Sequence, residues 1–96
     1  MKPHHESSLL LALDQIYLEG TTSVLWSQIY LWYNAERLRK SAYADIQERW
    51  EDLWLGKHPK SEVPVLRALS LKERLTLIRG DFTEGNQLWA DFKDWT

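Results

Sequence analysis

The three histidines of this sequence are the residues best suited to catalysis or metal binding. His4 and His5 adjoin Glu6 near the start of the chain, and His58 precedes Pro59. Adjacent residues do not easily direct their side chains at one ion, and no second cluster supplies the rest of a metal shell. Neither a glycine-flanked serine nor a Ser-His-acid set accompanies His58. We therefore predict no metal site and no catalytic residue.

The other reactive residue types are absent or spaced as solvated side chains. The chain has no cysteine, which excludes disulfides, thiolate catalysis and cysteine-ligated zinc. Glu48, Glu51 and Asp52 alternate with Arg49 and apolar residues, which is typical of the polar face of a helix. No glycine-rich loop is present to hold a phosphate. The sequence predicts a protein that is not an enzyme and binds no cofactor.

A basic run, Arg37-Leu38-Arg39-Lys40, separates two segments with helical spacing. One hypothesis is a helix-turn-helix-like DNA-binding regulator using residues 37–50, in which the basic run contacts phosphates. Against this hypothesis stand the net charge of −2, the acidic residues Asp45 and Glu48, and a turn without glycine. Arg37, Arg39 and Lys40 also suit an acidic partner of another kind. Nucleic acid is thus the alternative partner in our prediction.

The six tryptophans are the most unusual feature of the composition. Tryptophan carries a large apolar area and one N–H donor, and it is enriched where surfaces are buried against a partner. We predict a small non-catalytic protein-binding module, such as an adaptor, regulator or inhibitor, that binds a protein in a homo-oligomer or a hetero-complex. The predicted partner-binding residues are Trp26, Trp32, Tyr33, Trp50 and Trp54.

Residues 24–33 are apolar around almost the whole circumference of a helix. Such a helix is buried on all sides. A central helix of the core and a surface covered by a second chain, as in a dimer, both satisfy this pattern.

The elements that would position these residues are predicted to be helices. Apolar residues recur at helical spacing, glycines follow the first and fourth segments, and sustained alternation with β-branched residues is not found. We expect an all-α bundle of four to five helices with no sheet: 8–19, 22–34, 41–55, 71–79 and 84–95, with a short turn near 62–69. Ser70 and Glu73 have capping-box spacing for the fourth helix. The first helix is expected to bury Leu9, Leu13 and Ile16.

The region 22–55 contains neither glycine nor proline. One straight helix of this length would be about 50 Å long and would overshoot a domain of this size. The polar stretch 34–41 is the favoured position for a break, and a continuous helix that pairs with another chain is the alternative.

Length and composition predict one domain over residues 1–96, with residues 1–7 as a flexible tail. An apolar content of 44% and a charged content of 27% are ordinary values for a globular protein. No segment has the length of a membrane span or the form of a signal peptide, so a cytoplasmic location is expected. The charge is uneven, because residues 57–79 carry six cations against two carboxylates.

Overall fold

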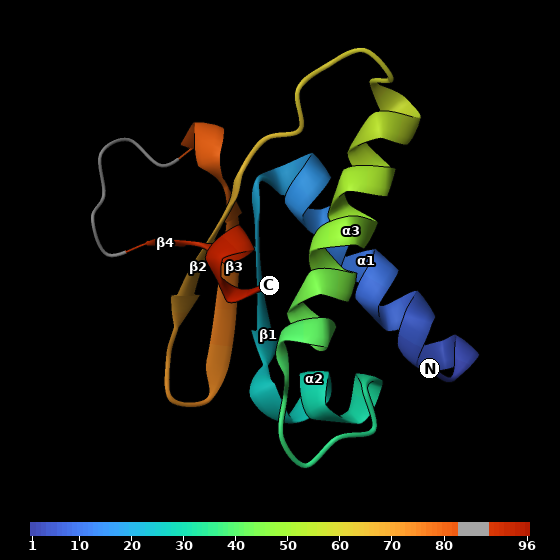
Figure 1. Ribbon diagram of the computed structural model, residues 1–96, viewed down its shortest axis with the longest axis vertical. Coiled ribbons are helices and arrows are strands. Elements are labelled where there is room, and N and C mark those ends of the chain that lie inside the picture. Colours follow the sequence, from blue (N-terminus) through green and yellow to red (C-terminus); the bar gives the residue numbers. More distant parts are fainter. Residues whose placement is uncertain (83–88) are drawn as a thin grey trace.

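A four-stranded antiparallel sheet forms one layer of the protein in a computed structural model, which describes residues 1–82 and 89–96 (Figure 1). The all-α prediction is therefore wrong. The strands lie in the order β1-β3-β2-β4. The elements are α1 (Pro3–Glu19), β1 (Thr21–Leu25), α2 (Trp26–Trp32), α3 (Lys40–Lys57), β2 (Leu66–Ser70), β3 (Arg74–Arg79), the 3-10 turn η1 (Gly80–Phe82), β4 (Ala90–Asp91) and the 3-10 turn η2 (Phe92–Trp95).

The central strand β3 shows why the helical prediction failed. Leu71, Leu75 and Ile78 have helical spacing, but Leu75 and Leu77 also alternate with polar or β-branched neighbours, as a strand requires. Leu75 and Leu77 are buried, and β3 pairs with both β1 and β2. The predicted helix 71–79 is thus replaced by a strand, because pairing on both sides outweighs local helical spacing. The predicted capping box is part of the β2–β3 turn, where Leu71 N–H donates to the Arg74 carbonyl.

Three other predicted elements need correction. The start of the predicted helix 22–34 is the strand β1, in which Thr22 and Val24 point inward and their neighbours outward. The turn expected near 62–69 ends in β2. The predicted helix 84–95 falls partly outside the described residues, and its described part holds β4 and η2. These strands have two to five residues, too few to reveal the alternation in the sequence.

Helix α1 confirms the predicted stripe, since Leu9, Leu13 and Ile16 are buried. It begins at Pro3, so residues 3–7 are helical where a flexible tail was expected. It ends at Gly20, whose backbone has a φ of 91° and whose N–H donates to the Ile16 carbonyl. The left-handed conformation favours glycine, as the sequence predicted.

The break expected at 34–41 is present. Helix α2 ends at Trp32 and α3 begins at Lys40, with Asn34 between them at a φ of 48°. Because β1 precedes α2, the region 22–55 holds one strand and two helices and fits a body of 34 × 30 × 22 Å.

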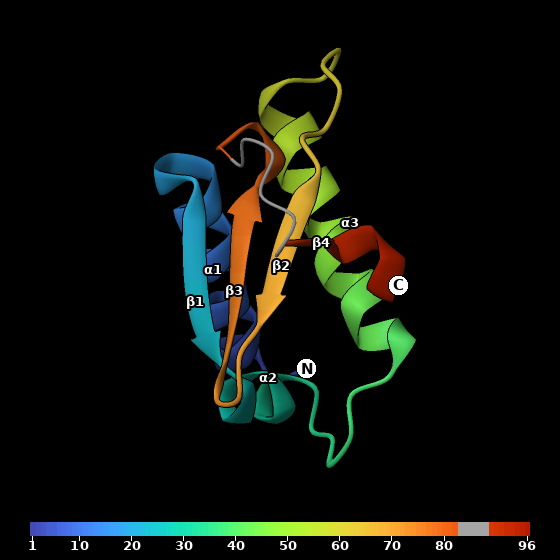
Figure 2. The ribbon, with the colours of Figure 1, turned by 90° about the vertical axis from the view of Figure 1, so that its left-hand side faces the viewer.

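One core lies between the sheet and the helices. Figure 2 views the sheet from the face opposite α1, with α1 behind it. Trp50 and Phe92 are the largest wholly buried side chains. The Trp50 indole N–H donates to the Pro64 carbonyl at 3.0 Å, which holds α3 against the segment that enters β2. Among the described helices, none has the length and apolar character needed to cross a membrane.

Gly20 offers a test of this fold. A Cβ at Gly20 would lie 2.7 Å from Cδ2 of Phe82, whereas a Cβ at Gly56 in α3 would meet nothing within 4 Å. We expect Gly20→Ala to lower the free energy of unfolding by about 2 kcal/mol through backbone strain and this close contact. Gly56→Ala should raise it by up to about 1 kcal/mol, because alanine favours the helix. Chemical denaturation of both variants measures the difference, and equal effects would contradict the turn described here.

Candidate functional site

The aromatic residues predicted to bind a partner lie mainly in or against the core. Trp32 and Trp50 are 3% and 0% exposed, so the folded chain does not present them. Trp26 is half-buried and its indole N–H donates to the Leu71 carbonyl at 2.9 Å. Trp54 packs edge-on against Tyr17 with ring centroids 5.5 Å apart. These four tryptophans hold the elements together, and the predicted role in partner binding stays a prediction.

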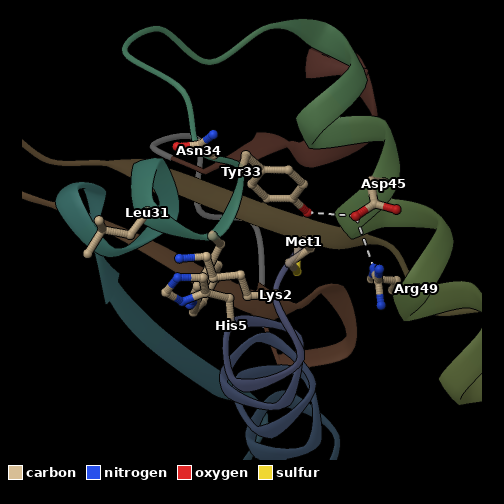
Figure 3. A pocket seen from close by; sticks show the side chains of 9 residues that line it. Met1, Lys2, His5, Leu31, Tyr33, Asn34, Asp45 and Arg49 are labelled. Carbon is tan, nitrogen blue, oxygen red and sulfur yellow. Dashed lines mark hydrogen bonds and ion pairs between the residues drawn. The ribbon is translucent and has the colours of Figure 1, made fainter.

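Tyr33, the fifth predicted residue, belongs to a polar network that joins three helices, and Figure 3 shows the part of it that Tyr33 forms with Asp45 and Arg49. Its hydroxyl donates to Oδ2 of Asp45 at 2.8 Å, and Nε of Arg49 donates to the same oxygen at 2.9 Å. Arg49 also reaches Glu6 of α1 at 3.3 Å. The network therefore fixes the end of α2, which precedes the basic run in the chain, against α3 and α1.

The same network shifts two pKa values. Burial, followed by the hydrogen bond and the negative charge of Asp45, raises the pKa of Tyr33 well above its ordinary value. The hydrogen bond to Asp45 raises the pKa of Arg49. Tyr33 thus stays a neutral donor and Arg49 a cation, which is the pairing that the geometry requires.

The basic run projects from the connection between α2 and α3. Arg37, Arg39 and Lys40 are exposed, and none forms an ion pair within the described part of the chain. Lys72 and Arg74, at the β2–β3 turn, are also exposed and unpaired there. In both ribbon views the α2–α3 connection, the start of α3 and this turn lie at the same end of the molecule (Figures 1 and 2).

We name these five cations, Arg37, Arg39, Lys40, Lys72 and Arg74, the basic end. Glu36 and Glu73 lie in the same two segments, so five cations face two carboxylates and the net charge is +3. A recess lies between the hairpin turn and the helices α2 and α3, lined by Trp26, Tyr30, Tyr43, Ser70, Leu71 and Lys72. Because one recess is lined by residues of all three elements, the turn of the hairpin lies next to both α2 and α3.

The sequence alone indicates three of the five cations of the basic end as one cluster. It marks Arg37, Arg39 and Lys40, and separately the positive segment 57–79. Within that segment Arg67 pairs with Asp91 and Arg79 with Asp81, each at 2.7 Å. The β2–β3 hairpin brings Lys72 and Arg74 close to the basic run. They can be located from the sequence only if β2 and β3 are predicted as strands.

The outward side of α3 changes character along its length. Its first two turns expose Lys40, Ser41 and Ala44. Its later turns carry Glu48 and Asp52 at the surface, with Glu51 half-buried beside them. The surface of α3 is therefore positive at its beginning, negative over its middle turns and positive again at Lys57 in its last turn.

The histidine and carboxylate side chains are spread over the part of the chain that the structure describes. No group of three or more histidine and carboxylate side chains there is placed to hold a metal ion. His58 Nε2 lies 2.9 Å from the Tyr17 hydroxyl, which ties the end of α3 to α1.

Comparison with known proteins adds no further assignment. No family model matches the chain, and neither a curated protein nor a solved structure matches it.

The Tyr33 network predicts a pH dependence of stability. An unfolded phenol ionises near pH 10, while the folded phenol keeps its proton to higher pH. The contribution of Tyr33 to stability is therefore complete below about pH 10 and is lost as the pH rises further. Tyr33→Phe should cost about 1–2 kcal/mol at neutral pH, where a hydrogen bond to a carboxylate is removed. Its stability should then fall less steeply above pH 10 than that of the parent chain. Urea denaturation across this range is the measurement, and parallel curves would contradict the assignment.

Proposed function

We propose that the chain binds duplex DNA through the basic end. The observation that carries this proposal is the convergence of five exposed cations from two segments that are distant in the sequence. Each of them is free of an ion pair among the described residues, and Arg74 alone of the five donates a side-chain hydrogen bond there, at 3.5 Å to Ser23 Oγ, so no ion pair has to break before they meet a phosphate. Phosphate contacts supply most of the affinity of non-specific DNA binding.

The order of the elements supports the same function. Two successive helices, α2 and α3, are followed by the β2–β3 hairpin, and the sheet order places β3 between β1 and β2. This order resembles that of a winged helix-turn-helix, with a longer connection between the two helices (residues 33–39) and a fourth strand on β2, and a likeness of fold by itself carries no function. In a helix-turn-helix protein the beginning of the second helix contacts base edges in the major groove. Here those positions are Ser41 and Ala44, with Lys40 beside them.

The start of α3 is unfavourable for the helix itself. Arg39 occupies the N-cap without a side-chain cap hydrogen bond, and the first turn contains no acidic residue. Cations near a helix N-terminus oppose the helix dipole at a cost of about 0.3–1 kcal/mol each. Two adjacent cations, Arg39 and Lys40, thus weaken the helix locally. A role in binding phosphate gives them a physical reason, since functional sites are where local rules are broken.

The acidic side of α3 limits how DNA can dock. Glu48 and Asp52 would repel phosphates laid along the whole helix. A duplex that meets only the first two turns of α3 and the hairpin turn avoids them. The proposed contact is therefore small, and we expect modest, strongly salt-dependent affinity.

Binding of a protein partner is the second candidate function. Its support is a pair of exposed leucines one heptad apart on α1, Leu11 at 71% and Leu18 at 78% exposure. Apolar residues on the solvent side of a helix are common in helix-mediated contacts. The aromatic residues named from the sequence contribute less to this candidate, because the core already uses them.

Removal of charge from the basic end tests the proposal against a matched control. Arg39→Gln with Lys40→Gln should lower the slope of log affinity against log salt by about 2, since about one counterion is released for each phosphate contact. Lys57→Gln with Lys60→Gln removes the same net charge near the other end of α3 and should leave the slope unchanged. Fluorescence anisotropy with a short labelled duplex measures both. Absence of salt-dependent binding by the parent chain, or equal losses in the two variants, would reject DNA binding.

The N-cap provides a second prediction with two opposite readouts. Arg39→Ser introduces a hydroxyl cap and removes a cation from the start of α3. We expect the free energy of unfolding to rise by about 1 kcal/mol while the affinity for duplex DNA falls. Denaturation and anisotropy on the same sample give both values. A variant that is more stable and binds equally well would show that Arg39 does not contact the phosphate backbone.

A further inference from the structure

The outer edge of β1 is an unpaired strand edge. β1 is the terminal strand of the sheet (Figure 2), and among residues 1–82 and 89–96 it pairs only with β3. Trp26 N–H donates to the Glu73 carbonyl and Arg79 N–H donates to the Gly20 carbonyl, at the two ends of the β1–β3 ladder. Along an antiparallel ladder, hydrogen-bonded residue pairs alternate with pairs that are not hydrogen-bonded. Gly20 and Trp26 belong to hydrogen-bonded pairs, so the even-numbered residues of β1 bond to β3. The odd-numbered residues Thr21, Ser23 and Leu25 therefore direct their N–H groups outward.

The two edges of the sheet differ in how they are protected. At the other edge, β2 pairs with β4, and Arg67 and Asp91 form an ion pair there at 2.7 Å. Strand edges that stay unpaired usually carry a charge or a proline that blocks association. β1 reads Thr-Thr-Ser-Val-Leu and has neither. Its outward residues Thr21, Ser23 and Leu25 are all exposed.

From this edge we infer that two copies of the chain associate by antiparallel pairing of β1 with β1, about a two-fold axis at Ser23. In this register Ser23 faces its own copy and Thr21 faces Leu25, so the outward groups match. The outward N–H groups of Thr21, Ser23 and Leu25 in the two copies could form about six intermolecular hydrogen bonds. The Leu25 carbonyl of each copy is directed into α2 as its N-cap, so about four remain. A two-fold, self-complementary contact is the commonest form of association between identical chains.

Side chains and charges favour a second copy in this orientation. On the helix-facing side the register places Thr22 opposite Val24, a pair of β-branched residues that suits neighbouring strands. β1 itself is uncharged, so the two copies do not repel each other along the strand. Glu19 lies just before the strand, and Arg74 lies opposite its last residue. Antiparallel pairing brings Glu19 of each copy towards Arg74 of the other copy. Parallel pairing would instead place Glu19 near Glu19 and Arg74 near Arg74.

The absence of cysteine from the chain allows a direct test by cross-linking. Residues opposite each other in a hydrogen-bonded antiparallel pair have Cα atoms about 5.5 Å apart, within the range of about 4.4–6.8 Å that a disulfide spans. Ser23→Cys should therefore form a disulfide-linked dimer under mild oxidation. Thr76→Cys is the matched control, because Thr76 pairs with Ser23 on the neighbouring strand and would lie about 14 Å from its own copy. We expect Ser23→Cys to cross-link at least tenfold faster.

Sedimentation equilibrium gives an independent measurement without oxidation. Ser23→Lys would place two lysines against each other at the two-fold axis and should abolish the dimer, whereas Thr76→Lys should retain it. Circular dichroism of both variants establishes that they are folded. A parent chain that remains monomeric at the highest concentrations, or equal cross-linking of the two cysteine variants, would overturn the inference. Neither measurement involves DNA, so failure of DNA binding and failure of self-association are distinguishable.

Discussion

The hydrogen bond from the Trp50 indole to the Pro64 carbonyl is the interaction on which the arrangement of the candidate surface depends. Trp50 is wholly buried in α3, and Pro64 lies in the segment that leads into β2. Burial of the ring removes a large apolar area from water, while the indole N–H keeps a partner. The bond therefore sets the position of β2 relative to α3. Because the hairpin follows from β2, this position also brings Lys72 and Arg74 to the end where α3 begins.

A second constraint acts on the connection between α2 and α3. Tyr33 and Arg49 share one carboxylate oxygen of Asp45, so the last turn of α2 is attached to the second turn of α3. The connection between them carries Arg37 and Arg39. A loop anchored on both sides loses less conformational entropy on binding than a free loop. The polar network thus supports the basic end although none of its members belongs to it.

The sequence predicted what depends on local spacing and missed what depends on pairing. The buried stripe of α1, its end at Gly20 and the break before α3 all follow from residues close together in the chain. The strands do not, because β1, β2 and β4 have only two to five residues each, and β3 matches a helical pattern through Leu71, Leu75 and Ile78 as well as its own alternation. The candidate site divides in the same way. Arg37, Arg39 and Lys40 are a visible run, whereas Lys72 and Arg74 join them only through the hairpin.

The two proposed surfaces constrain each other geometrically. A two-fold axis that pairs β1 with its own copy runs perpendicular to the sheet and reverses the direction of every strand. The basic end lies at the end of β1 where Leu25 is paired with Arg74, so the two basic ends of a dimer point in opposite directions. Helix-turn-helix dimers that read one operator place both recognition helices on the same side of a duplex. A dimer formed through β1 could not do so, and its two copies would each hold a separate duplex. Together, the two proposals therefore imply that a dimer formed through this edge links two DNA segments and does not recognise a palindromic site.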